Sequence, residues 1–176
     1  MGFWPGGDRD GNPFVTADTT LKVAHALRGS IIKCYYLEIR RMKRRLTFKG
    51  IDAILNGLEK QLYDNIFIPG YQTDLTTTYI LDELNKIKEI IIYKHNGLFL
   101  HLVNNLINKV NVFGLYFASL DVRQESTIHN TVLENIHGEV YSKLSAAEKI
   151  NFCTTAPAVS TEKVYTDALV NDTVKN

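Results

Sequence analysis

The residues best suited to chemistry lie near the start of the chain, where residues 6–13 read Gly-Gly-Asp-Arg-Asp-Gly-Asn-Pro. The glycines allow the backbone to turn sharply and to approach a ligand closely. A guanidinium group binds phosphate or carboxylate through paired hydrogen bonds, so we expect the flanking acids to hold Arg9 in one orientation toward an anion. Two alternatives stay open. One is a surface turn with a local salt bridge, and the other is a divalent cation bound by Asp8, Asp10 and Asn12, although the spacing departs from that of a calcium loop.

A second polar cluster occupies residues 120–129, Leu-Asp-Val-Arg-Gln-Glu-Ser-Thr-Ile-His. It follows an apolar run, residues 112–122, which we expect to form a short buried strand. Polar side chains at the end of a strand are typical of the functional residues of α/β barrels. An alternative stays open, in which these residues only stabilise the local structure: Ser126 caps the next helix, and Arg123 pairs with Asp121 or Glu125.

The elements that position these clusters are mainly helical. Helical periodicity predicts helices over residues 17–46, 51–67, 75–93, 98–110, 126–136 and 145–153, and one more from residue 161 to the end. Thr16 or Asp18 is the expected N-cap of the first helix, and Ser145 with Glu148 forms a capping box. Short connections favour antiparallel neighbours. The predicted fold is mainly α, a helical bundle with one or two short strands. The apolar stripes include Leu27, Ile31, Cys34, Met42, Ile54, Leu55, Leu58, Leu62, Ile80, Leu84, Ile87, Ile91, Leu98, Leu102, Leu106 and Val110.

Composition excludes several classes of protein. The formal net charge of +1 gives no reason to expect nucleic acid as a partner, and no apolar run reaches the roughly 20 residues that cross a bilayer. We interpret both cysteines as reduced, buried residues of a cytoplasmic protein. The five histidines include no pair at metal-ligand spacing, and His95 and His101 are expected to face solvent. The basic run between Arg40 and Arg45 is interpreted as a solvated helix face near a C-terminus.

Together the two polar clusters resemble the phosphoenolpyruvate carboxylase family. Its members have a Gly-Gly-Asp-Arg-Asp-Gly-Asn-Pro segment followed by a Val-Thr-Ala-Asp helix start, as in residues 6–18, and later a Leu-Asp-Ile-Arg-Gln-Glu-Ser segment. Here Val122 replaces the isoleucine, and Ile128 stands where the family usually has arginine before His129. The family's Thr-Ala-His-Pro-Thr and His-Gly-Arg-Gly-Gly segments and its two metal-binding carboxylates have no match in this chain.

The resemblance implies an activity and roles for particular residues. The family forms oxaloacetate and phosphate from phosphoenolpyruvate and bicarbonate with Mg²⁺ or Mn²⁺, whose ligands lie outside the matched segments. Arg9 matches the arginine assigned to the phosphate and bicarbonate region and is the expected catalytic residue. The matching substrate-binding positions are Gly6, Gly7, Asp8, Arg9, Asp10 and Asn12. Supporting positions that orient the loop and substrate are Arg123, Gln124, Glu125 and His129.

The resemblance also predicts that the chain is one internal fragment of a large, cytoplasmic, homo-oligomeric α/β barrel enzyme. We divide it into an active-site loop and helix start (residues 1–18), a helical insertion (19–111), a strand with the second motif (112–129) and C-terminal helices (130–176). We expect the fragment to be inactive and to self-associate through exposed apolar surface, with no nucleic acid or membrane as a partner. The alternatives are a non-catalytic helical interaction module that retains an anion-binding loop, and a small phosphate-binding protein.

Overall fold

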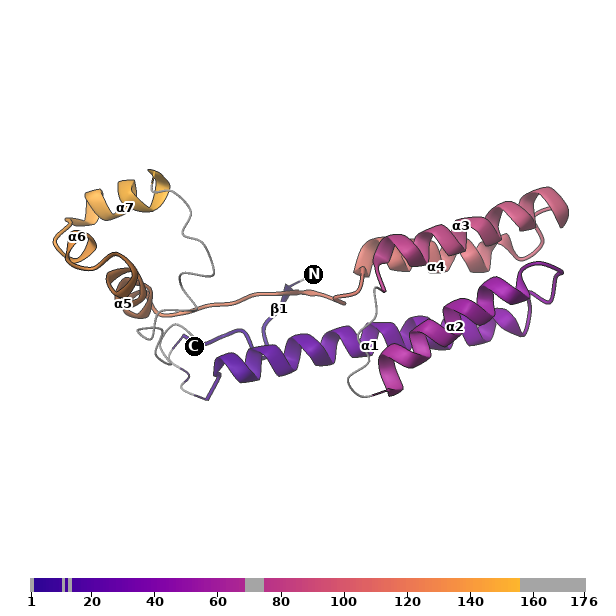
Figure 1. The fold of residues 1–176 in the computed structure, drawn as a ribbon, viewed down its shortest axis with the longest axis horizontal. Coiled ribbons are helices and arrows are strands. Elements are labelled where there is room, and N and C mark those ends of the chain that lie inside the picture. The colour runs from indigo at the N-terminus through magenta and orange to yellow at the C-terminus, as the bar shows by residue number, and fades with distance from the viewer. Residues whose placement is uncertain (1, 11, 13, 69–74, 156–176) are drawn as a thin grey trace. The chain divides into compact units, whose positions relative to one another are not determined.

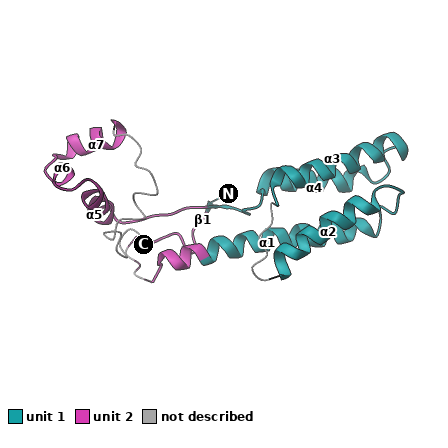
Figure 2. Cartoon of the chain, viewed as in Figure 1, with its two compact units in different colours: residues 1–2, 22–119 teal, residues 3–21, 120–176 magenta. Residues whose placement is uncertain are grey.

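The computed structural model describes residues 2–10, 12, 14–68 and 75–155. The chain divides into two compact units, which Figure 2 distinguishes by colour: residues 1–2 and 22–119 form unit 1, and residues 3–21 and 120–176 form unit 2. The described residues are mainly helical, as predicted from the sequence. The last predicted helix, from residue 161 onward, lies outside the described residues.

Unit 1 is a bundle of four helices (Figure 1). They are α1 (Ala17–Lys43, whose first residues belong to unit 2), α2 (Asp52–Phe67), α3 (Thr77–Lys94) and α4 (Leu100–Phe113). Helices α3 and α4 lie side by side and are joined by a short turn, as expected for antiparallel neighbours. The N-cap of α3 is Thr76, whose hydroxyl accepts a hydrogen bond from the Tyr79 N–H at 3.1 Å.

Apolar side chains at helical spacing form one core within unit 1. The stripe predicted for α3 is buried as expected, and so are the central residues of α2 and α4. The fully or almost fully buried members of these three helices are Leu55, Leu58, Leu62, Ile80, Leu84, Ile87, Ile91, Val103, Leu106 and Val110. The prediction was wrong for Leu98, which is 53% exposed because it lies in the turn before α4, on no helix face.

Helix α1 begins at one of its two predicted caps, but a cysteine that we predicted to be buried in it is exposed. Thr16, and not Asp18, caps α1, because its hydroxyl accepts a hydrogen bond from the Thr19 N–H at 3.3 Å. Cys34 and Cys153 are both free thiols, but both are exposed and not buried as predicted. For Cys34 the reason is that the buried face of α1 contains its neighbour Tyr35 instead.

Unit 2 contains most of the remaining elements. Strands β1 (Gly2–Phe3) and β2 (Ser119–Leu120) pair in a two-stranded sheet, of which Phe3 and Leu120 belong to unit 2. Helices α5 (Ser126–His137), α6 (Glu139–Ser142) and α7 (Ala146–Thr155) follow. Tyr141 of α6 is buried, with its ring centroid 5.6 Å from that of Phe152. The predicted capping box begins α7, where the Ser145 N–H donates to Glu148 Oε2 at 2.8 Å.

The strand predicted over residues 112–122 is much shorter than expected. Helix α4 extends to Phe113, and Gly114 ends it with a positive φ of 52° while its N–H donates to the Val110 carbonyl. The apolar run then divides, because Leu115 joins the core whereas Tyr116 is 71% exposed. Among the described residues of this run, only Ser119–Leu120 forms a strand.

Of the two histidines that we expected to face solvent, only one is exposed. His95 is half-buried and stacks on Phe48 with ring centroids 4.3 Å apart, so the prediction that it faces solvent was wrong. His101 is exposed, as expected.

Within the described residues, no helix has both the length and the apolar character that a membrane span requires.

The hydroxyl of Tyr35 gives a prediction about the bundle. This buried hydroxyl donates to the Gly114 carbonyl at 2.7 Å, and burial, with a smaller electrostatic contribution from the neighbouring Cys34, raises the pKa of Tyr35 from 10.0 to about 12. We expect Tyr35→Phe to lower the free energy of unfolding by about 1 kcal/mol near neutral pH, because it leaves that carbonyl without its donor.

The pH dependence has a definite sign. Because the folded state holds the phenol proton more tightly, the contribution of Tyr35 is complete below pH 10 and is lost as pH rises toward 12. The stability difference between the original chain and Tyr35→Phe should therefore be constant up to about pH 10 and shrink from about pH 10 to about pH 12 in urea titrations. Tyr93→Phe, at a tyrosine that is 83% exposed, is the control. A difference that stays constant with pH would contradict the assignment.

Candidate anion-binding site

The two motifs that the sequence places far apart are joined by main-chain hydrogen bonds within unit 2. The Arg123 N–H donates to the Gly7 carbonyl at 2.9 Å, and the Arg9 N–H donates to the Arg123 carbonyl at 3.0 Å. Arg123 thus bonds to the residues on either side of Asp8, in a parallel bridge. A further bond, from the Asp121 N–H to the Phe3 carbonyl at 3.0 Å, aligns the same two segments. The loop and the second motif form one structure.

The geometry of the loop requires glycine at both position 6 and position 7. Gly6 has a φ of 83°, a left-handed conformation that side-chain-bearing residues rarely adopt. Gly7 is buried, and a Cβ atom at this position would lie 2.3 Å from the Asp121 carbonyl oxygen. Real Cβ atoms do not approach an oxygen so closely. Only glycine at position 7 allows the two segments to come within hydrogen-bonding distance.

The Arg9 side chain is held by a neutral hydroxyl group and not by carboxylates. Its Nη2 donates to Thr20 Oγ1 at 2.8 Å, and that hydroxyl donates in turn to the Gly6 carbonyl at 2.6 Å. Among the described residues no ion pair joins Arg9 to Asp8 or Asp10, so our expectation that the flanking acids hold it was wrong. The Nε of Arg9 is buried and has no hydrogen-bond partner in the described structure.

Thr20 is a site residue that the sequence reasoning missed. It lies in the first turn of α1, where its hydroxyl also contacts the Thr16 carbonyl at 3.3 Å. Its position one turn after the capping threonine was the available signal, because side chains four residues apart lie on the same face of a helix. That face is directed toward the glycine loop.

The second motif contributes side chains that support the loop more than they enclose a cavity. The Arg123 guanidinium lies 4.4 Å from the centroid of the Trp4 ring, and its Nε is 3.4 Å from Asp121 Oδ2. Pairing of Arg123 with Asp121 was one of the two expected alternatives and is confirmed. Ser126 as the cap of the next helix was wrong: Glu125 occupies the N-cap position of α5 and makes no side-chain capping bond.

The other predicted residues are more peripheral. Gln124 Oε1 accepts a hydrogen bond from the Glu125 N–H at 3.1 Å, and His129 is an exposed residue of α5. Asn12 Oδ1 accepts from the Phe14 N–H at 3.1 Å, and Asp10 is exposed. The structure therefore brings together Gly6, Gly7, Arg9 and Arg123. It gives no contact between His129 and the loop.

The described residues do not supply a metal site. No group of three or more His, Cys, Asp or Glu side chains in this part of the chain is arranged as metal ligands. The resemblance itself places the ligands of its divalent cation outside the segments of this chain.

Comparison with known proteins shows the family. The sequence profile of phosphoenolpyruvate carboxylase matches residues 1–72 and 70–168, which is most of the chain. The chain belongs to the phosphoenolpyruvate carboxylase family. The two matched segments meet in the connection between α2 and α3.

The chain is similar to curated proteins named phosphoenolpyruvate carboxylase. The phosphoenolpyruvate carboxylase of Trichormus variabilis is 26% identical over 231 aligned positions, which include 99% of this chain and 22% of the relative. That of Haemophilus influenzae is 29% identical, over 76% of this chain and 18% of the relative. The chain thus spans about a fifth of the length of these relatives.

The close approach at Gly7 gives a prediction. We expect Gly7→Ala to push the two segments apart and to cost about 1–3 kcal/mol of local stability, because the added methyl group clashes with backbone and not with a flexible side chain. Amide hydrogen exchange should accelerate at Arg9 and Arg123, whose N–H groups make the bonds between the segments.

Gly29→Ala is the matched control, because nothing lies within 4 Å of a Cβ atom at that position in α1. Replacement of a helical glycine by alanine should stabilise the chain by about 0.5–1 kcal/mol. If Gly7→Ala left the exchange rates of both amides unchanged, the close approach would be disproved.

Proposed function

We propose that this chain is a part of a phosphoenolpyruvate carboxylase that forms oxaloacetate and phosphate from phosphoenolpyruvate and bicarbonate, and that Arg9 binds anionic oxygens of the reactants. One observation gives this proposal its main support. The Arg9 guanidinium is fixed by Thr20 Oγ1 while no carboxylate among the described residues neutralises it. A fixed positive charge of this kind is what a reaction through anionic species requires.

The hydrogen-bonding capacity of Arg9 fits this role. A guanidinium group has five N–H donors in a planar fork, and the described structure uses one of its Nη atoms, toward Thr20. In this proposal the remaining Nη donors bind phosphate, bicarbonate or the developing enolate oxygen. Because the backbone of Arg9 is tied to Arg123 and its side chain to Thr20, little reorganisation is needed when the anion binds.

The other predicted residues act through the loop in this proposal. Gly6 and Gly7 shape the loop, Asp8 lies at its bridge to Arg123, and Asp10 and Asn12 lie at its outer end. Gln124, Glu125 and His129 follow Arg123 along the second motif and position it. The Mg²⁺ or Mn²⁺ ion would be held by residues elsewhere in the enzyme.

Exposed apolar side chains support the view that more of the enzyme packs on unit 2. Trp4, Phe14 and Val122 are 55%, 86% and 56% exposed, although large apolar residues usually avoid water when they are not part of an interface. In this proposal the remainder of a cytoplasmic, homo-oligomeric enzyme covers them. The chain by itself would then associate with its own copies.

The first test uses the chain of 176 residues alone. We expect no bicarbonate-dependent formation of oxaloacetate from phosphoenolpyruvate, followed as NADH oxidation by added malate dehydrogenase, because the chain spans only 22% of a curated relative. Activity above a blank without bicarbonate would contradict the proposal that the chain is only a part of the enzyme.

The second test places Arg9→Lys in the polypeptide encoded by the complete gene. Lysine keeps the charge but loses the planar fork, so kcat should fall by about 10²–10³-fold, with far-ultraviolet circular dichroism unchanged. Arg28→Lys, on α1 and outside the loop, is the matched control and should keep its activity. Equal rates for the two variants would contradict the role of Arg9.

A further inference from the structure

Half of the residues that line a pocket in unit 1, remote in sequence from the glycine loop, are basic. It has a volume of about 610 Å³ and lies between the last turns of α1 and the middle of α4. Four of its lining residues are basic, namely Arg41, Arg44, Arg45 and Lys109, and one, Glu38, is acidic. The buried side chain of Met42 forms an apolar part of the wall.

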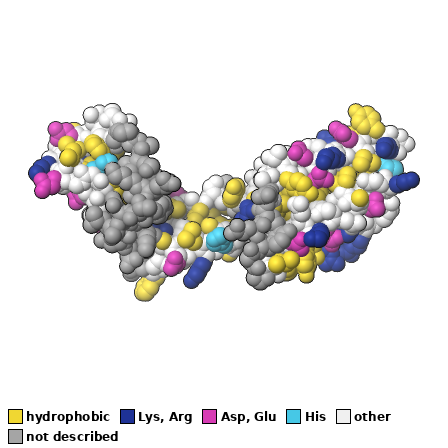
Figure 3. Space-filling view, in the orientation of Figure 1, with side chains coloured by type: hydrophobic (Ala, Val, Ile, Leu, Met, Phe, Trp, Pro, Cys, Tyr) yellow, Lys and Arg dark blue, Asp and Glu magenta, His cyan; other side chains and the backbone are white. Residues whose placement is uncertain are grey.

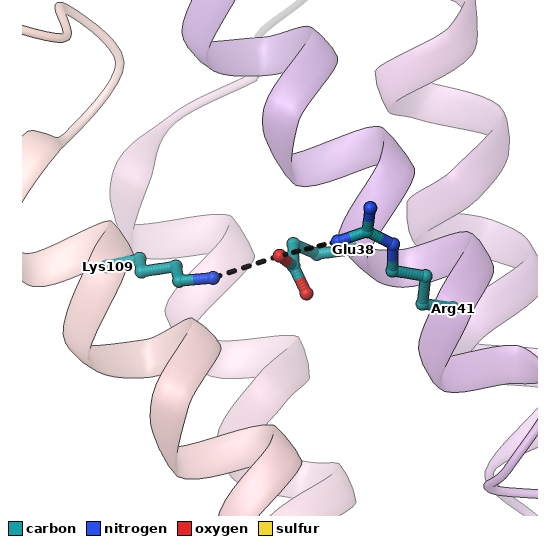
Figure 4. A network of polar contacts seen from close by, with 3 residues as sticks. All are labelled: Glu38, Arg41 and Lys109. Carbon is teal, nitrogen blue, oxygen red and sulfur yellow. Dashed lines mark hydrogen bonds and ion pairs between the residues drawn. The ribbon is translucent and has the colours of Figure 1, made fainter.

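The single carboxylate of the pocket is shared between two cations, as Figure 4 shows. Glu38 Oε1 lies 2.9 Å from Lys109 Nζ and 3.4 Å from Arg41 Nη1. These contacts hold a cation from α1 and another from α4 on opposite sides of the carboxylate. They neutralise one positive charge and leave an excess of three around the pocket.

Two other basic residues of the same run pair with a different carboxylate. Arg40 Nε lies 3.6 Å from Glu59 Oε1 on α2, and Lys43 Nζ also pairs with Glu59. Arg44 and Arg45 differ, because neither has an ion-pair partner among the described residues. Figure 3 shows Lys and Arg side chains gathered in a dark-blue group on unit 1.

Stabilisation of the end of a helix does not account for Arg44 and Arg45. Cations interact favourably with a helix dipole within its last turn, and α1 already has Arg40, Arg41 and Lys43 there. Arg44 and Arg45 lie in the turn that follows. Their position is fixed by the Leu46 N–H, which donates to the Met42 carbonyl at 2.8 Å, and by burial of the Leu46 side chain.

We propose that this pocket binds a small polyvalent anion, a compound with two or more phosphate or carboxylate groups. Its volume lies within the range of about 300–1,000 Å³ that small-molecule sites occupy. Arg41 and Lys109 are 69% and 48% exposed, so a single negative charge gains little from them in water. Glu38 also repels any anion that enters the pocket. A ligand with several charges contacts Arg44, Arg45 and Lys109 at once and overcomes both effects.

The test measures binding to the chain itself by calorimetry, with inorganic pyrophosphate and citrate as separate probes at matched ionic strength. We expect saturable binding of one or both probes, with chloride ineffective. The better probe identifies phosphate or carboxylate as the preferred group. The double variant Arg44→Gln/Arg45→Gln should weaken binding by about tenfold or more, because it removes both unpaired guanidinium groups.

Lys22→Gln/Lys33→Gln is the matched control, because it removes the same net charge from exposed positions of α1 outside the pocket. It should keep the affinity of the original chain. Absence of saturable binding, or equal weakening in the two double variants, would overturn the proposal. Circular dichroism establishes that each variant keeps its helices.

Discussion

The candidate site depends on one main-chain arrangement, in which Arg123 bonds to the residues on both sides of Asp8. Main-chain hydrogen bonds form whatever the side chains are, so their geometry is fixed by how closely the two segments can approach. That approach is limited by a single atom, since a Cβ at position 7 would lie 2.3 Å from the Asp121 oxygen. The glycine loop and the second motif are thus mutually dependent, and Arg9 has its position only while both segments are in place.

Unit 1 is organised by the ordinary physics of a helical bundle, and its electrostatics follow from that packing. Burial of one stripe on each helix fixes which residues of α1 point away from the core. The basic run at the end of α1 is thereby divided between two sides: Arg40 and Lys43 contact Glu59 of α2, whereas Arg41 shares Glu38 with Lys109 of α4. We expected the basic residues of this run to form one solvated helix face, but in the structure they lie in two different surroundings.

The sequence predicts the helices well because their signal is local. The apolar stripe of α3, the threonine cap of α1 and the capping box of α7 each depend on residues within a few positions of one another. The motifs also indicated the two segments that main-chain hydrogen bonds join. The length of the strand and the exposure of Cys34 were predicted wrongly because both depend on how the helices pack: α4 continues into the apolar run as far as Phe113, where Gly114 ends it, and Tyr35 takes the buried position beside Cys34.

The replacement of the expected carboxylates by Thr20 has a consequence for how the charge of Arg9 can be used. A carboxylate partner would orient a guanidinium group but would also cancel much of its charge, as Asp121 does for Arg123 and Glu59 for Arg40. A hydroxyl group orients it through a hydrogen bond and leaves the full positive charge. The proton of Thr20 is directed to the Gly6 carbonyl, so its oxygen can only accept from Arg9 in this arrangement. A neutral anchor therefore keeps Arg9 both fixed and fully charged, which an arginine held between two aspartates could not be.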